Sequence, residues 1–364
     1  MFTPLILYFS ILIGLAIFCQ LSLLFLGIKK NRSLPDELPQ ISILVAARNE
    51  KNTIIRCLES LEAMDYPKEK LEILVGNDGS TDITQQLAEV YISGKPIFSF
   101  VNITENLGRA KGKANVLAQL AQKSKGEYLF VTDADIAVKP CWALEMLKQF
   151  DKNTGIVSGV TVVRGNSTWA QWQGIDWMYF MGILQAFTNL GLPCTAVGNN
   201  MCVTRKAYEA TGGYQNIDFS IVEDYALFKE IRKLGYDSKN LFGTGVLNHS
   251  LPAKDLKTLM HQRKRWIRGV KQLPLMWQAI IVFSGFYIPA MLFLLFLNWK
   301  LFLGVFGLRY LLTLLAVFST SRKLKISWNS MPLLTFELYN WATTFLLTLF
   351  TILPIKINWK DRFY

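Results

Sequence analysis

The stretch Glu127-Tyr-Leu-Phe-Val-Thr-Asp133-Ala-Asp135 is an apolar run that ends in two carboxylates two residues apart. Alternate side chains of an extended chain share a face, so Asp133 and Asp135 are expected to point the same way just beyond a strand. Ligands of open α/β sheets bind outside the carboxyl ends of the strands. Two oxygen donors there suit a Mg²⁺ or Mn²⁺ ion that is also held by a diphosphate. An isolated Asp-Ala-Asp is more often a solvated turn, so the surrounding sequence must decide.

Other apolar runs predict parallel neighbours for this strand. Ile41–Ala47 and Leu71–Gly76 have strand character, and each is followed by polar residues and then by apolar residues at helical spacing. A third strand is expected near Ile97–Val101, and a helix from Gly112 precedes the strand that reaches Asp133. Strands that alternate with helices indicate an α/β domain with a mostly parallel sheet and right-handed crossovers.

An uncharged N-terminal segment predicts attachment to a membrane. The segment from Thr3 to Ile28 carries no charge and is long enough for a spanning helix. No basic residue precedes it, and Lys29-Lys30-Asn31-Arg32 follows it, so we expect an uncleaved anchor with the next domain in the cytosol. The formal net charge of +12 then suits contact with anionic lipids, and no nucleic-acid-binding signature is found.

The C-terminal third contains further apolar segments. Gln272 to Trp299 is uncharged and predicts a second span. Arg309 and Glu337 interrupt the two segments that follow, which leaves two or three C-terminal spans open. Unpaired charges at membrane depth are costly. We therefore expect that Arg309 and Glu337 pair with each other, that Arg309 holds an anionic acceptor headgroup, or that these segments are interfacial.

Several short motifs follow one another in a fixed order. Together they resemble glycosyltransferase family 2, the inverting nucleotide-sugar transferases with the GT-A fold, over residues from about 41 to 270. The last motif is the QxxRW type of membrane-integrated members, namely ceramide glucosyltransferases and cellulose, hyaluronan and poly-N-acetylglucosamine synthases. The matching residues are Ala47-Arg48-Asn49-Glu50, Asn77-Asp78-Gly79-Ser80-Thr81-Asp82, Gly112-Lys113-Ala114, Asp133-Ala134-Asp135, Val222-Glu223-Asp224 and Gln262-Arg263-Lys264-Arg265-Trp266.

The resemblance implies a donor site at the edge of the sheet. It places Asp78 at the nucleoside, Glu50 near the base and Lys113 at the donor, where a helix start already favours an anion. It makes Asp135 the metal ligand, with Asp133 as its partner toward the ribose or diphosphate. The metal would neutralise charge on the departing diphosphate. The simpler interpretations are a turn or cap for Asp78 and a surface position for Lys113.

The Glu-Asp motif is the candidate for acid–base chemistry. An inverting transferase needs one base to deprotonate the acceptor hydroxyl. The resemblance assigns that role to Asp224 and leaves Glu223 as support. Both residues also suit the N-terminus of a helix for electrostatic reasons alone.

The QxxRW residues Gln262, Arg265 and Trp266 are spaced i, i+3, i+4, so they lie along one side of a helix. We expect an amphipathic helix at the membrane surface that caps the active site. Arg265 suits a diphosphate through bidentate bonding, and Trp266 offers a flat face to a sugar or acceptor. A basic interfacial helix with an aromatic anchor is the alternative.

The favoured interpretation is an integral membrane enzyme that transfers a sugar from a nucleotide-diphosphate donor to a lipid or lipid-linked acceptor at the cytosolic face. A processive polysaccharide synthase that extends a growing glycan is the alternative, and a non-catalytic nucleotide-binding membrane subunit is a third. The expected organisation is an N-terminal anchor (1–28), a GT-A domain (38–254), an interfacial helix (255–271), a transmembrane region (272–355) and a basic tail (356–364).

Overall fold

A computed structural model describes residues 3–25, 33–360 and 362–363, so Lys29, Lys30, Asn31 and Arg32 lie outside the described residues. The chain forms two compact units. The sheet unit comprises Ile28–Val162 and Thr195–Leu251. The helical unit comprises Met1–Gly27, Val163–Cys194 and Pro252–Tyr364.

The sheet unit is built on a seven-stranded sheet of mixed direction. Its strands, in spatial order, are β3 (Phe98–Asn102), β2 (Leu71–Asn77), β1 (Ile41–Ala47), β4 (Tyr128–Asp133), β7 (Asn200–Thr204), β5 (Thr154–Ser158) and β8 (Asp237–Asn240). The first four run parallel, whereas β7 is antiparallel to both β4 and β5. Ala46 of β1 pairs with Gly76 of β2 and with Asp133 of β4, so three strands end at one edge. The predicted mostly parallel α/β fold is confirmed.

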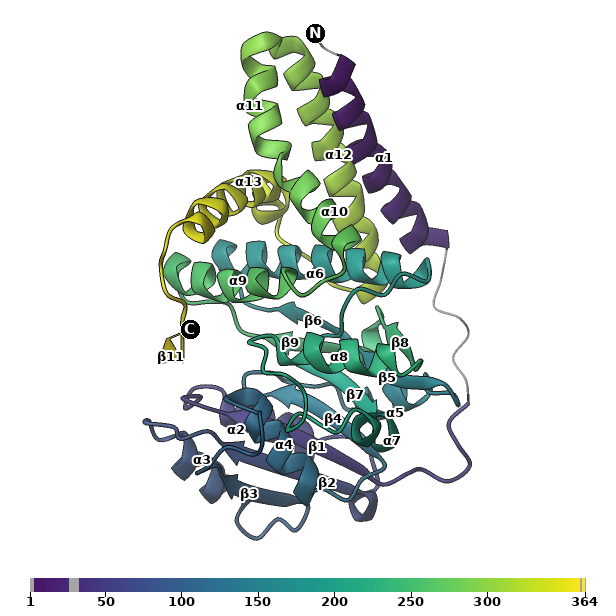
Figure 1. Ribbon diagram of the computed structural model, residues 1–364, viewed down its shortest axis with the longest axis vertical. Coiled ribbons are helices and arrows are strands. Elements are labelled where there is room, and N and C mark those ends of the chain that lie inside the picture. Colours follow the sequence, from purple (N-terminus) through teal and green to yellow (C-terminus); the bar gives the residue numbers. More distant parts are fainter. Residues whose placement is uncertain (1–2, 26–32, 361, 364) are drawn as a thin grey trace. The chain divides into compact units, whose positions relative to one another are not determined.

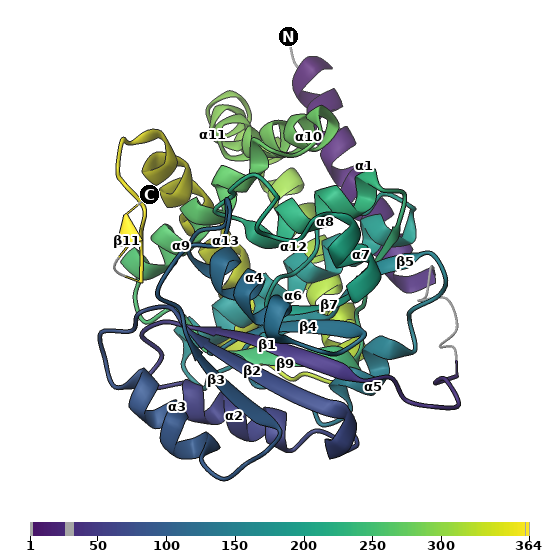
Figure 2. The same cartoon turned by 60° about the horizontal axis from the view of Figure 1, so that its bottom comes forward.

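Helices cover both faces of the parallel strands. Figure 2 shows α2 (Ile54–Glu62) and α3 (Thr84–Ile92) on one face and α4 (Lys113–Lys123) on the other. Every residue of β1 is buried, as expected of a strand covered on both sides. A Cβ added at Gly76 would lie 2.4 Å from Val116 Cγ1, so a glycine there lets α4 approach the sheet closely.

Shorter elements complete the sheet unit. They are η1 (Lys68–Lys70), α5 (Trp142–Leu147), α7 (Arg205–Ala210), α8 (Glu223–Lys233), η2 (Thr244–Val246) and a second sheet of β6 (Val160–Val163) and β9 (Leu247–Ser250). Beyond Asp135 the chain meets β9, because Ala137 N donates to His249 O and His249 N donates to Ala137 O, both at 2.9 Å. This bridge places the backbone of β9 beside the acidic loop.

The helical unit consists of mostly apolar helices, the basic helix α9 and a short C-terminal ribbon. Its elements are α1 (Thr3–Phe25), α6 (Thr168–Asn189), α9 (Leu256–Val270), α10 (Leu275–Gly285), α11 (Tyr287–Leu297), α12 (Trp299–Leu324), α13 (Ser330–Ile352), β10 (Asn358–Trp359) and β11 (Arg362–Phe363). Helix α1 runs beside α12 (Figure 1), and Ser22 Oγ donates to Ala186 O of α6 over 3.0 Å. This bond joins the N-terminal helix to α6.

Among the described residues, two helical segments are long and apolar enough to cross a membrane. They are Leu275–Leu297, with a mean hydropathy of 2.4, and Trp299–Leu324, with 2.1; the described Thr3–Phe18 of α1 is a shorter apolar helix. Asn298 joins the two segments and caps α12 by accepting from Leu301 N over 3.0 Å. The predicted segment 326–355 forms α13, which packs on α6 and α9. These apolar helices indicate a membrane protein.

Candidate functional site

Two polar loops interlock at the edge where β1 and β2 end. Thr81 N donates to Asn49 Oδ1 over 2.8 Å, and Asn49 N donates to Ser80 Oγ over 3.2 Å. Arg48 Nη1 donates to Asp78 O and to Gly79 O. The motifs 47–50 and 77–82 therefore form one surface, on which Asp78 is held through its backbone.

Glu50 is buried and is not an exposed side chain on the donor side of the loop. Its side chain is buried, with Thr53 Oγ1 donating to Glu50 Oε2 at the start of α2, and its amide donates to Thr84 Oγ1 over 2.7 Å. These bonds give Glu50 a structural task in joining the β1 loop to α2 and α3. Contact between Glu50 and the base remains a prediction.

Lys113 lies at the centre of an acidic cluster. Its Nζ is 2.6 Å from Asp133 Oδ1 and 2.8 Å from Glu223 Oε1, so α4, β4 and α8 converge on one ammonium group. Gly112 precedes it with φ 57°, a left-handed conformation that a glycine adopts without strain. Burial alone would lower the pKa of Lys113, but the carboxylates of Asp133 and Glu223 outweigh it and raise that pKa well above its ordinary value. The amine therefore stays charged.

Asp133 and Asp135 flank the fully buried Ala134. Both are partly exposed, and Ser250 Oγ lies 3.4 Å from Asp135 Oδ2. Across residues 3–25, 33–360 and 362–363, no third His, Cys, Asp or Glu completes a metal cluster with them. Two carboxylates fit a hard cation that takes its remaining ligands from water and a diphosphate, as Mg²⁺ usually does.

Asp224 is held at the start of α8 by two backbone amides. Gly198 N donates to its Oδ2 and Tyr225 N to its Oδ1, each over 2.8 Å. A Cβ added at Gly198 would lie 2.7 Å from Asp224 Cβ, so this close approach requires glycine. Burial and the neighbouring Glu223 raise the pKa of Asp224 to about 6, against the opposing effects of Lys113 and the two amides. A carboxylate with that pKa is suited to accept a proton near neutral pH.

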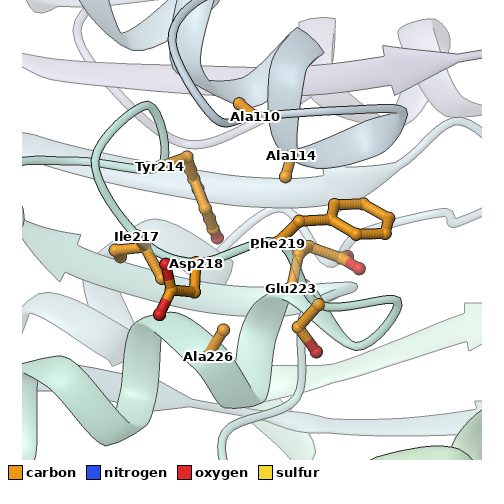
Figure 3. A pocket seen from close by; sticks show the side chains of 9 residues that line it. Ala110, Ala114, Tyr214, Ile217, Asp218, Phe219, Glu223 and Ala226 are labelled. Carbon is orange, nitrogen blue, oxygen red and sulfur yellow. The ribbon is translucent and has the colours of Figure 1, made fainter.

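A pocket beside Glu223 contains Tyr214, a residue to which no sequence motif assigns a role. Tyr214 is 4% exposed, and within the described part of the chain its hydroxyl has no hydrogen-bond partner. Figure 3 shows its ring on the pocket wall, and the space of about 210 Å³ is partly open to solvent. The lining residues are Ala110, Ala114, Tyr214, Ile217, Asp218, Phe219, Ser220, Glu223 and Ala226. The Gly212-Gly213 turn before Tyr214 is the sequence signal that marks this segment.

The QxxRW residues belong to helix α9 of the helical unit. Trp266 packs edge-on against Trp177 of α6, with ring centroids 5.3 Å apart. Arg263 pairs with Asp176 of α6 and lies over the Trp266 ring. These contacts join α9 to α6 and fix Trp266. The roles of Gln262 and Arg265 at a donor or acceptor remain predictions.

Lys264 of the same helix is buried rather than exposed to solvent or lipid. Its Nζ donates to Phe350 O over 2.7 Å and to Leu353 O over 2.9 Å, at the C-terminal end of α13. A cation at the free carbonyls of a helix end is favourable. Lys264 therefore caps α13, a role that its position within the QxxRW motif does not indicate.

Comparison with known proteins extends over most of the chain. Residues 6–364 match the model of glycosyl transferase family 21. The probable glycosyltransferase YdaM of Bacillus subtilis is 29% identical over 294 residues, covering 74% of this chain and 66% of the relative. Poly-beta-1,6-N-acetyl-D-glucosamine synthase of Staphylococcus aureus is 31% identical over 239 residues, covering 64% of this chain and 55% of the relative. The chain thus spans between about half and two thirds of the length of these relatives.

A solved structure shares the fold. A mannosyltransferase from Pyrobaculum calidifontis, determined with GDP-Man and Mn²⁺, superposes with a TM-score of 0.57 at 18% identity. The match covers 94% of this chain and 99% of the mannosyltransferase chain. It supports the GT-A fold of the sheet unit.

Proposed function

The chain belongs to glycosyl transferase family 21, and from that premise we propose that it is a membrane-bound inverting glycosyltransferase. It would move a sugar from a nucleotide-diphosphate sugar to a lipid or lipid-linked acceptor at the cytosolic membrane face. The observation that carries this proposal is the cluster in which Lys113 bridges Asp133 and Glu223 beside Asp224, the carboxyl group whose pKa lies near 6.

Asp224 is the proposed base. Its carboxylate takes the proton of the acceptor hydroxyl as that oxygen attacks the anomeric carbon, while the bond from that carbon to the diphosphate breaks on the opposite face. The two amides from Gly198 and Tyr225 orient the carboxylate without protonating it. Asp224 returns to its starting form when it passes the proton to solvent.

The donor is proposed to lie along the edge formed by Asp78, Lys113, Asp133 and Asp135. A Mg²⁺ or Mn²⁺ ion held by Asp133 and Asp135 would neutralise charge on the leaving diphosphate. Lys113 already carries its charge at this edge, so it can bind a diphosphate oxygen when the donor arrives. A GDP-Man and Mn²⁺ complex of the structural relative supports a donor of this class.

The membrane segments support a site on the cytosolic side. The two segments Leu275–Leu297 and Trp299–Leu324 are joined by the single residue Asn298, so a hairpin that crosses twice returns α13 to the side of α9. With α1 as a further crossing, the basic groups Lys29–Arg32, Arg322–Lys325 and Lys356 would all lie inside. The positive-inside tendency is then satisfied without a third C-terminal span.

A processive polysaccharide synthase is the second candidate. The similarity to poly-beta-1,6-N-acetyl-D-glucosamine synthase favours it specifically. Both candidates use the same donor edge and the same base, so they differ in what occupies the acceptor side. A single addition requires release of the product, whereas a processive enzyme must pass the glycan onward.

Incubation of membranes containing the chain with a panel of nucleotide sugars, followed by mass spectrometry of the products, tests the proposal. A lipid that gains one sugar supports the first candidate, and a ladder of lengths supports the second. Activity should disappear with excess chelator and in Asp135→Ala. If no nucleotide sugar is consumed, the chain is a non-catalytic nucleotide-binding subunit; full activity in chelator would remove the metal from the proposal.

A further inference from the structure

Helix α2 is bonded to the backbone of the acidic loop by three side chains on two successive turns. Cys57 Sγ lies 3.6 Å from Asp133 O, and Arg56 Nη2 donates to Asp135 O. Ser60 Oγ accepts from Val138 N over 3.1 Å. Helix α2 therefore bonds the backbone of the segment that carries both candidate metal carboxylates.

Arg56 is the one of these three side chains that contacts two segments outside α2. Its Nη2 also lies 3.4 Å from His249 O, so one guanidinium group joins α2, the acidic loop and β9. Among the residues that the structure describes, no carboxylate forms an ion pair with Arg56, and its charge is directed at the carbonyl oxygens of Asp135 and His249. Hydrogen bonds from a charged donor are stronger than those from a neutral one.

Holding the Asp135 carbonyl restricts the direction of its Cα–Cβ bond. The carbonyl and the Cβ share the same Cα, so a fixed peptide plane limits where the carboxylate can point. Ser250 of β9 lies beside the Asp135 carboxylate, and Arg56 bonds the preceding residue of β9. The same guanidinium thus bonds the backbone of Asp135 and the backbone of the strand that carries the hydroxyl neighbour of its carboxylate.

We propose that Arg56 is a positioning residue for the divalent cation, acting through Asp135 and resting on the metal role in the proposed function. The guanidinium bonds main-chain oxygens of the loop and of β9, so it acts on the backbone that carries the Asp135 side chain. Groups that orient metal ligands in this way commonly contribute tenfold or more to metal affinity. Lysine is a poor replacement, because both carbonyls are reached by Nη2, which lies one bond further from the Cα than the lysine Nζ would.

The matched control is Arg205, which makes the same kind of bonds elsewhere in the sheet unit. Its Nε donates to Gly126 O over 2.7 Å, and Nη2 donates to Ser124 Oγ over 2.9 Å. These bonds lie before the start of β4, whereas Arg56 acts beyond its end. Arg205→Lys therefore loses comparable bonds without touching the acidic loop.

The test is a titration of the purified full chain in detergent with Mn²⁺. The electron paramagnetic resonance signal of free Mn²⁺ measures binding. The titration is done without nucleotide and again with UDP or GDP. Arg56→Lys should weaken Mn²⁺ binding by about tenfold or more, while Arg205→Lys binds as the wild type does. Thermal unfolding of each variant separates positioning from folding. Arg56→Gln, whose amide can still donate to one carbonyl, serves if Arg56→Lys does not fold, and it should show an intermediate affinity.

The outcomes separate the two proposals. A wild-type chain that binds no Mn²⁺ under any of these conditions removes the metal from the proposed function. A wild type that binds Mn²⁺, with Arg56→Lys or Arg56→Gln equal to Arg205→Lys in affinity, overturns the role of Arg56 and leaves the metal in place.

Discussion

Arg309 Nε donates a hydrogen bond to Glu337 Oε1 over 2.8 Å and joins α12 to α13. Trp341 Nε1 donates to the same carboxylate oxygen over 3.1 Å, and the Arg309 guanidinium lies 3.9 Å from the centroid of the Tyr287 ring. The pairing predicted from the two interrupting charges is confirmed. Each charge compensates the other in otherwise apolar helices.

Arg309→Leu and Glu337→Leu should each lower the yield of folded protein in membranes. The Glu337 side chain is 1% exposed and that of Arg309 32%, so either change leaves a poorly solvated charge, at a cost of up to about 3 kcal/mol. The double variant should recover much of the yield, since no unpaired charge remains. The measurement is the yield of monodisperse protein after extraction in detergent. Purely additive losses in the double variant would contradict a direct interaction between Arg309 and Glu337.

The strands, helices and the ion pair that could be predicted from the sequence are each marked by a strong pattern in the nearby residues. Strands β1, β2 and β4 are apolar runs of strand length, and the helices between them carry apolar residues at helical spacing. Arg309 and Glu337 were predictable as partners because uncharged helices offer a buried charge few alternatives.

The features that escaped prediction depend on contacts between distant segments. Strand β7 enters the sheet antiparallel between β4 and β5, and nothing in its five residues indicates direction. Residues 163–194 join the helical unit because the face of α6 packs on α1 and α13. The burial of Lys264 follows from where α13 ends, about 90 residues downstream, which spacing on α9 alone cannot reveal.

Lys264→Ala should destabilise the helical unit. The change removes two charge-assisted hydrogen bonds to Phe350 O and Leu353 O and leaves the end of α13 without its cation, a loss of about 2 kcal/mol. Lys257→Ala, at an exposed position on the same helix, should have little effect. Thermal unfolding in detergent compares the two, and equal midpoints would show that the cap contributes nothing.

Arg265→Lys should reduce transfer strongly although the charge is kept, because lysine cannot bond a diphosphate through a bidentate fork. The control is Arg268→Lys, the same substitution at an exposed position of α9. The donor KM and kcat of both variants are the measurement. Similar values for the two would mean that α9 acts only as a basic membrane contact.

Asp224→Asn should remove transfer while donor binding persists, because an amide keeps the shape of the carboxyl group but cannot take a proton. Glu230→Gln, further along α8, is the control. A product assay measures turnover, and calorimetry measures binding of the nucleotide sugar, so the loss of catalysis is separated from any loss of donor binding. Near wild-type turnover in Asp224→Asn would end its assignment as the base.

The pH profile of the wild type should follow the Asp224 carboxyl. Its pKa is raised from 3.8 to about 6, so the base is ionised above about pH 6 and kcat/KM should fall about tenfold per pH unit below it. A raised pKa means that the folded state binds this proton more readily, so protonation of Asp224 itself stabilises the fold as the pH falls from 6 to 4. Activity is then lost while this group favours folding, which unfolding curves at each pH can verify. A kcat/KM that stays flat down to pH 4.5 contradicts the assignment.

Lys113→Met should change the affinities for metal and donor in opposite directions. In the absence of donor the Lys113 ammonium lies 2.6 Å from Asp133 Oδ1, so it competes with a cation for that oxygen. Its removal should tighten binding of Mn²⁺ alone several-fold. The nucleotide sugar should bind about tenfold more weakly, since its diphosphate loses a charged partner. Lys111→Met, an exposed neighbour before α4, should alter neither affinity. Weaker binding of both ligands by Lys113→Met, at an unchanged unfolding temperature, would mean that Lys113 organises Asp133 and Glu223 for the metal instead of competing with it.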